Sequence, residues 1–189
     1  MRDRLTAATL GIILAGSLLT GCNNAETETD AGPPVRARVE DTQAEIAGGA
    51  CELLNFGVVH DFLDVEFNVA AAGEQKETIT CVLQQGDAPW PDLSLAVSET
   101  SADAEVFGSD VKPEGAEAVK DLGKAAYKLV SDGTKDHGPS AEIGWLSSNG
   151  RILMLRYTFA KDQQKAAATD LAPVLVDMAK DLDATLVAT

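Results

Sequence analysis

The stretch from residue 141 to residue 159 reads AEIGWLSSNGRILMLRYTF, and it decides the fold. Asn149-Gly150 separates two runs rich in strand-forming residues, Ala141–Ser147 and Arg151–Phe159. Both central residues of a type I′ turn need positive φ, which Asn-Gly adopts easily, so we expect a β-hairpin here. The four contiguous apolar residues 152–155 indicate a second strand that is partly buried on both faces and therefore central in its sheet.

The segment after this hairpin predicts the clearest helix of the chain. Apolar residues recur at helical spacing from Leu171 to Leu182, and charged residues fall on the opposite side. Asp170 is the expected N-cap, which places Pro173 in the first turn, where proline is tolerated. Residues 161–169 are expected to form an earlier helical segment that joins this helix at a kink.

Further strands are expected before the hairpin, at Thr78–Gln85, Leu93–Ser98 and Lys124–Val130, where apolar and polar residues alternate or strand formers gather. Glu52–Asp64 carries an apolar stripe at helical spacing, and Ala102–Ala118 predicts a short helix and a loop. This order predicts an α+β domain. Its mainly antiparallel sheet of about five strands would pack against N- and C-terminal helices.

The N-terminus predicts export and a lipid anchor. Arg2 and Arg4 precede an apolar run, Ala7–Leu19, which has the length of a signal-peptide core and is too short to span a bilayer. The run ends at Leu19-Thr20-Gly21-Cys22, which resembles a bacterial lipobox. That resemblance implies removal of residues 1–21 and attachment of diacylglycerol to Cys22, on the extracytoplasmic face of the cell membrane. The alternative is an ordinary cleaved signal followed by a chance cysteine.

Residues 22–47 are expected to be a flexible tether, because they are polar, contain a Gly-Pro-Pro break and offer little to bury. A single folded domain, residues 48–189, would follow. Removing residues 1–21 takes away two arginines and one aspartate, so the net charge changes from −15 to −16. Such an acidic protein cannot present the basic patch that displaces counterions from phosphates, so nucleic acid is excluded as a partner.

The two cysteines other than Cys22 predict a disulfide. An exported protein meets oxidising conditions, and Cys51 and Cys81 form an even pair. Such a bond would join the first helix to an early strand. A metal site or a reactive thiol is a less favoured alternative, because neither cysteine has a nearby histidine or a second cysteine two or three residues away.

Three short motifs stand out along the folded part of the chain: Cys51-x-Leu53-Leu54, Cys81-x-Leu83 and Leu122-Gly123-x-Ala125-Ala126-Tyr127. Together they resemble small secreted lipoprotein domains of unknown function from actinobacteria. The resemblance covers about Cys51 to Thr185 and implies an envelope-exposed fold in which a Cys-x-Leu-Leu helix is tied to a strand cysteine. It implies no established catalytic residues. Some similar extracytoplasmic sensor domains have a second disulfide, which this chain lacks, and this weakens a sensor interpretation.

Two groups of residues could hold a metal ion, but ordinary interpretations are favoured for both. His60, Asp61, Asp64 and Glu66 have ligand-like helical spacing, but a solvated acidic helix end is the favoured explanation for them. Residues 132–138 loosely resemble an oxygen-rich cation loop and miss the EF-hand pattern. Nothing groups a histidine with a nucleophile, and no catalytic motif is present, so we expect no enzyme, no metal and no cofactor.

The remaining candidate is Trp90, which lies between Pro89 and Pro91. It is either an exposed binding anchor or a plug over the edge of the core, and plugs are commoner. Together with the loops 86–92 and 131–140 it predicts a non-catalytic binding module for an envelope protein or glycan. The alternative is a carrier of an apolar ligand or lipid in a pocket between sheet and helix, and an envelope hydrolase ranks third. Trp145 is expected in the core.

Overall fold

A computed structural model describes residues 38–40, 43–86 and 88–188. All of the described residues belong to one compact unit. Cys22, the expected signal peptide and most of the expected tether lie outside the described residues. Within the described part of the chain, no helix is both long and apolar enough to cross a membrane.

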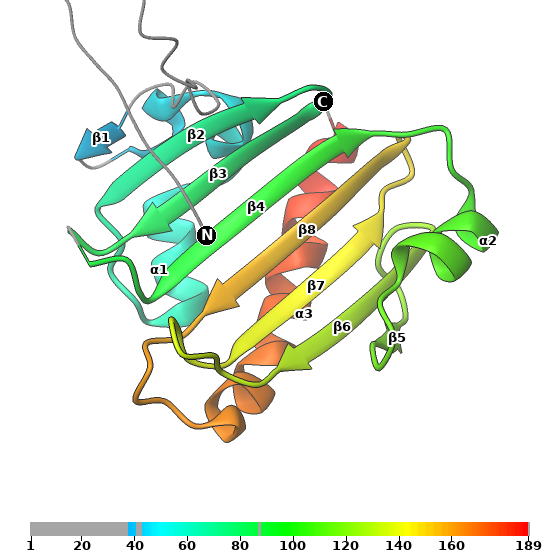
Figure 1. Cartoon of the computed structure of the whole chain (residues 1–189). Helices are drawn as coiled ribbons and strands as arrows, with labels where there is room; N and C mark the ends of the chain where they lie inside the picture. The colour runs from blue at the N-terminus through cyan, green and yellow to red at the C-terminus, as the bar shows by residue number, and fades with distance from the viewer. Residues whose placement is uncertain (1–37, 41–42, 87, 189) are drawn as a thin grey trace, which may run out of the picture. The chain divides into compact units, whose positions relative to one another are not determined.

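The described strands form one antiparallel sheet in the order β1-β2-β3-β4-β8-β7-β6-β5 (Figure 1). The α+β class and the antiparallel sheet are confirmed, although the described residues form eight strands where the sequence predicted about five. The strands are β1 (Arg38–Glu40), β2 (Val69–Gln75), β3 (Thr78–Gln84), β4 (Asp92–Glu99), β5 (Glu117–Val119), β6 (Ala125–Ser131), β7 (Ser140–Leu146) and β8 (Arg151–Thr158).

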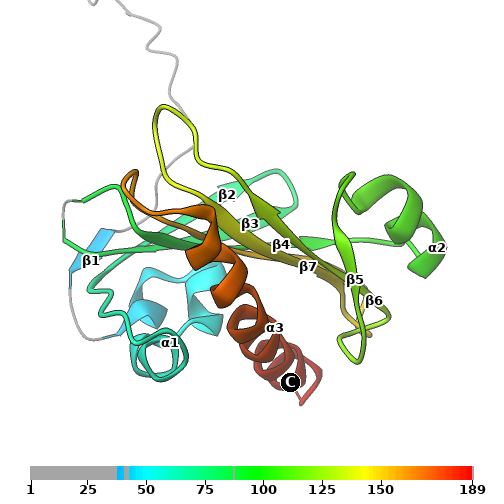
Figure 2. The same cartoon turned by 90° about the horizontal axis from the view of Figure 1, so that it is seen from below.

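Two helices and two short 3₁₀ helices cover one face of this sheet (Figure 2). The helices are α1 (Phe56–Leu63) and α3 (Lys165–Ala188), and the 3₁₀ helices are η1 (Ala44–Ala47) and η2 (Gly49–Leu53). α3 packs on β6 and β7. Trp145 of β7 is fully buried, as the sequence predicted, and its Nε1 donates to Asp183 Oδ1 of α3 at 3.0 Å.

The opposite face of the sheet, called the open face below, carries a smaller apolar cluster at its β6 end. Phe107, Tyr127 and Leu146 are its buried members. Phe107 belongs to the π-helical turn η3 (Phe107–Val111), which continues the short helix α2 (Ala104–Val106). In Figure 1, α2 lies beside β5 and β6, away from the helices of the main core.

The expected disulfide is present. Cys51 of η2 and Cys81 of β3 are bonded, and both side chains are fully buried. Alternation along β3 turns Cys81 and Leu83 to the helix-covered face, where η2 lies against the strand. The bond therefore attaches the 3₁₀ segment at the start of the domain to the third strand of the sheet.

The β7–β8 hairpin forms, but its turn differs from the expected type I′ turn. Asn149 is not among the described non-glycine residues with positive φ, whereas Gly150 has φ 79°. Gly150 N–H donates to the carbonyl of Ser147, and Ser147 N–H donates to the carbonyl of Arg151. The residues between Ser147 and Arg151 thus form a three-residue loop, and glycine provides its left-handed position.

Both expected terminal helices have different boundaries in the structure. The predicted helix Glu52–Asp64 is divided into η2 and α1, because Asn55 caps α1 by accepting hydrogen bonds from Gly57 N–H and Val58 N–H. The predicted N-cap at Asp170 is wrong. α3 already begins at Lys165 and runs through Pro173, so proline lies in the helix interior instead of the first turn.

The folded domain begins earlier than Gly48, the expected boundary. β1 pairs with β2 from Arg38↔Ala71 to Glu40↔Val69, and Ala44 and Ala47 of η1 are buried in the main core. The expected tether therefore includes residues that belong to the fold. β2 itself was not predicted, and it fills the place between β1 and β3.

Candidate functional site

The two loops expected to make contacts lie at the same end of the sheet. The β3–β4 loop and the β6–β7 loop meet there (Figure 1), and the rings of Trp90 and His137 are in contact with centroids 5.3 Å apart. Trp90 is half-buried, so it is neither a fully exposed anchor nor a fully buried plug. The structure thus joins residues 47 positions apart in the chain into one surface, which we call the Trp90–His137 surface.

Hydrogen bonds to neighbouring segments hold both loops in place. Gln84 Nε2 donates to the carbonyl of Pro89 at 3.2 Å, which fixes the β3–β4 loop next to Trp90. Gly138 N–H donates to the carbonyl of Phe159 at 2.9 Å. A side chain at Gly138 would clash with the carbonyl of Ala160, so glycine permits this close approach. The two rings are therefore presented from anchored backbone.

A row of polar side chains crosses the open face beside this surface. The register places Asp92 of β4 opposite Thr158 of β8, and Arg156 opposite Glu142 of β7. Arg156 Nη2 donates to Ser140 Oγ at 3.1 Å, and its Nη1 lies 4.0 Å from Glu142 Oε2. Charges of both signs alternate along this row.

Asp92 is the electrostatically unusual member of the row. Burial raises the pKa of its carboxyl above the ordinary value of 3.8, while hydrogen bonds from Thr158 and the charges of Arg156 and His137 oppose that shift. Asp92 Oδ1 and Arg156 Nε are buried without a hydrogen-bond partner among the described residues. The side chains of this row therefore meet only part of one another's hydrogen-bonding capacity.

The geometry at His137 differs from that of a nucleophile–base pair. His137 Nδ1 lies 2.6 Å from the carbonyl of Gly138. The nearby hydroxyl of Ser140 accepts a hydrogen bond from Arg156, and the Ser140 side chain is only 2% exposed. A buried hydroxyl bonded in this way cannot attack a substrate from solvent.

The two possible metal-binding groups are not assembled as ligand sets. In the described residues there is no group of three His, Cys, Asp or Glu side chains that could hold a metal ion. Asp64 ends α1 with a left-handed conformation, and its N–H donates to the carbonyl of His60. Asp132, in the other motif, accepts from Lys165 Nζ at 2.9 Å.

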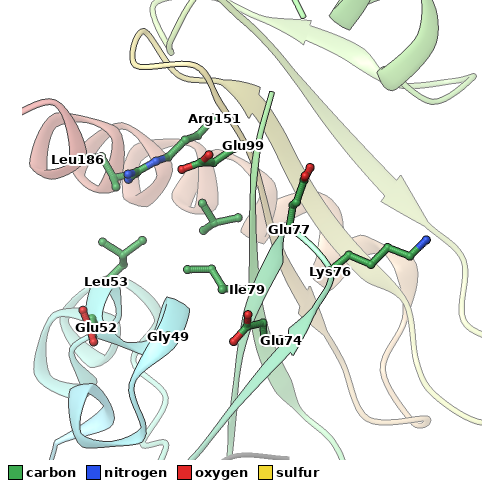
Figure 3. A pocket seen from close by; sticks show the side chains of 11 residues that line it. Gly49, Glu52, Leu53, Glu74, Lys76, Glu77, Ile79, Glu99, Arg151 and Leu186 are labelled. Carbon is green, nitrogen blue, oxygen red and sulfur yellow. The ribbon is translucent and has the colours of Figure 1, made fainter. Parts of the chain in front are cut away.

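A pocket of about 340 Å³ lies at the opposite end of the sheet, on the helix-covered side (Figure 3). Its apolar lining comes from Leu53, Ile79, Val97 and Leu186, on η2, β3, β4 and α3. The polar lining comprises Glu52, Glu74, Lys76, Glu77, Glu99 and Arg151, with Gly49 completing the wall.

Comparisons with protein-family models, with curated proteins and with solved structures found no match to this chain.

Sequence reasoning found the Trp90–His137 surface in part and missed its surroundings. Trp90 and both loops were identified, but Asp92, Glu142 and Arg156 were not. Their alternation within strands was visible, but which residues stand opposite each other depends on strand register, and a shift of one residue moves every side chain to the other face. The pocket was missed because its walls come from segments far apart in the chain.

Proposed function

We propose that this protein is a lipid-anchored, non-catalytic binding module of the cell envelope. The observation that carries the proposal is the contact between Trp90 and His137, which unites two loops into one anchored surface at one end of the sheet. Half-buried aromatic side chains on loops held by a rigid scaffold are typical centres of protein and glycan recognition. The N-terminal lipobox motif supplies the proposed attachment at Cys22.

The partner is an envelope protein or a glycan presented near the membrane. Without residues 1–21 the chain has a net charge of −16, so it repels acidic partners and attracts basic ones, and association should slow as ionic strength rises.

The test is capture of envelope components by the full chain and by a Trp90→Ala variant. We expect Trp90→Ala to reduce recovery of the specific partner at least tenfold, since truncated central aromatic residues commonly weaken binding by this much or more. Val106→Ala is the matched control, because Val106 is 41% exposed and lies on α2, away from this surface. Equal recovery with all three proteins would refute the proposal.

A carrier of an apolar ligand or lipid remains the second candidate, and the pocket between sheet and helices favours it. A pocket of about 340 Å³ is at the small end of the range for ligand sites. Native mass spectrometry of the purified full chain would reveal a co-purified lipid. A uniform population carrying such a lipid would make the carrier the better account.

A further inference from the structure

We propose that the pocket at the β2–β3 hairpin end binds a small organic cation with an apolar body, such as an arylalkyl or alkyl ammonium ion. This inference is independent of the Trp90–His137 surface. It specifies that the apolar ligand of the carrier alternative would be positively charged.

The pocket has an apolar floor built from three elements. Val97 of β4 is buried, whereas Leu53 of η2 and Ile79 of β3 are half-buried and point toward the same space (Figure 3). Leu186 of α3 closes one side. An apolar ligand body on this floor would remove both its own surface and that of these side chains from water. This burial provides the part of the affinity that does not depend on the charge of the ligand.

The rim of the pocket is mainly negative. Four glutamates line it against two basic residues, Lys76 and Arg151. Lys76 lies in the β2–β3 turn, and in Figure 3 its side chain extends away from the apolar floor. Arg151 stands opposite Glu99 in the β4–β8 register, and Figure 3 shows the two side chains next to each other. A cation at this rim meets attraction, and a carboxylate meets repulsion.

The end of α3 borders the pocket. The helix runs to Ala188, and Leu186 in its last turn lines the pocket. The carbonyl groups of a final helical turn carry a negative partial charge that favours cations. One of them, the carbonyl of Leu186, accepts from Asn149 Nδ2 at 3.3 Å, which ties the helix end to the β7–β8 loop.

The walls are held in place before a ligand arrives. Cys51 of η2 lies between the pocket residues Gly49 and Leu53, and it is bonded to Cys81, two residues beyond Ile79. The disulfide thus fixes the distance between η2 and β3 across the floor. A preorganised pocket loses less conformational freedom on binding, which favours even a small ligand.

The test uses three probes with one apolar body and different charges: 4-phenylbutylammonium, 4-phenylbutanol and 4-phenylbutyrate. Their binding to the full chain with its disulfide formed is measured by isothermal titration calorimetry. We expect the ammonium ion to bind roughly five- to twentyfold more tightly than the alcohol at low salt, and the carboxylate more weakly than the alcohol. Added salt should narrow the difference.

Two variants locate the site. Glu99→Gln should weaken ammonium binding about twofold to fivefold and leave binding of the alcohol unchanged, because it removes one negative charge from the rim. Glu105→Gln is the matched control, because Glu105 is an exposed glutamate on α2, outside the pocket. Ile79→Phe should weaken all bound probes by filling the floor, with thermal unfolding used to verify that this variant folds.

Three results would overturn the inference. They are no binding of the ammonium probe, equal affinity for all three probes, or equal effects of Glu99→Gln and Glu105→Gln, which would indicate general surface attraction. None of these results concerns capture of a partner through Trp90. Either proposal can therefore be refuted without refuting the other.

Discussion

Gly144 and Tyr127 show how one missing side chain shapes the open face. They stand opposite each other on β7 and β6, and a Cβ at Gly144 would clash with the tyrosine ring. The ring therefore lies across the glycine, and its hydroxyl reaches Glu142 Oε1 at 2.8 Å. Burial and the Glu142 carboxylate both raise the pKa of Tyr127, which keeps it protonated as the donor.

Replacing Gly144 with alanine should displace this ring and destabilise the protein. We expect Gly144→Ala to lower the free energy of unfolding by about 1–3 kcal/mol, as overpacking commonly does. Gly108→Ala is the control, because a Cβ at Gly108 would meet nothing within 4 Å. Urea unfolding of both variants measures the difference, and equal stability of the two would contradict the close contact.

The carboxyl of Asp92 predicts a pH dependence. Because burial raises its pKa, the folded protein binds more protons than the unfolded chain once the pH exceeds 3.8, so stability falls as the pH rises through the raised pKa. The Asp92→Asn variant has no carboxyl group at this position, so its stability does not fall with pH for this reason. The unfolding free energy of the variant minus that of the parent protein should rise over this window and then become constant. A difference that stays flat from pH 3.5 to 7 would contradict the burial of Asp92.

At the scale of elements, the disulfide should account for a large share of stability. The bond joins residues separated by 30 positions, and a chain-entropy model assigns about 3–4 kcal/mol to closing such a loop. We expect the Cys51→Ser/Cys81→Ser double variant to lose roughly 2–4 kcal/mol, measured by urea unfolding. Peptide mapping that finds free thiols at both positions in the oxidised parent protein would contradict the bond itself.

The interior proline of α3 gives a second prediction at this scale. Pro173 is exposed, lacks the N–H that would reach Thr169, and should cost helix stability, so Pro173→Ala should stabilise the protein by about 1–3 kcal/mol. Asp170→Ala is the informative control. An N-cap would lose about 1 kcal/mol on this change, whereas a residue inside the helix should change stability little. A large loss with Asp170→Ala would contradict the observed start of α3.

Which elements the sequence could predict depends on whether local or distant contacts form them. β3 and β4 alternate clearly, and they formed within one residue of the predicted bounds. β2, with the sequence VAAAGEQ, has few strand formers, and it is a strand because β1 and β3 pair with both of its edges. The division of the first helix was foreseeable, since Asn55 is a good N-cap two residues before Gly57.

The register of the β7–β8 hairpin explains why the polar row could not be predicted. A two-residue Asn149-Gly150 turn would set Ser148 opposite Arg151 and would shift Arg156 away from Glu142. The observed loop sets Ser147 opposite Arg151 instead, and it brings those two charges together on the open face. One residue of loop length thus decides whether the charged row forms.

For the molecule as a whole, the two candidate sites lie at opposite ends of the sheet. β4 begins at Asp92, beside the Trp90–His137 surface, and ends at Glu99, in the pocket. Its eight residues span roughly 23 Å. Sites this far apart without shared partners usually behave additively.

Independence of the two sites is therefore the last prediction. Trp90→Ala should leave the affinity for 4-phenylbutylammonium unchanged within about twofold, and Glu99→Gln should leave partner capture unchanged. Calorimetry measures the ammonium affinity of the first variant, and capture assays measure partner recovery with the second. In the double variant, each of these two quantities should equal the product of the two single-variant effects on it. A departure of more than about fivefold from that product would mean that the sheet couples its two ends, because the described contacts give these residues no shared partner.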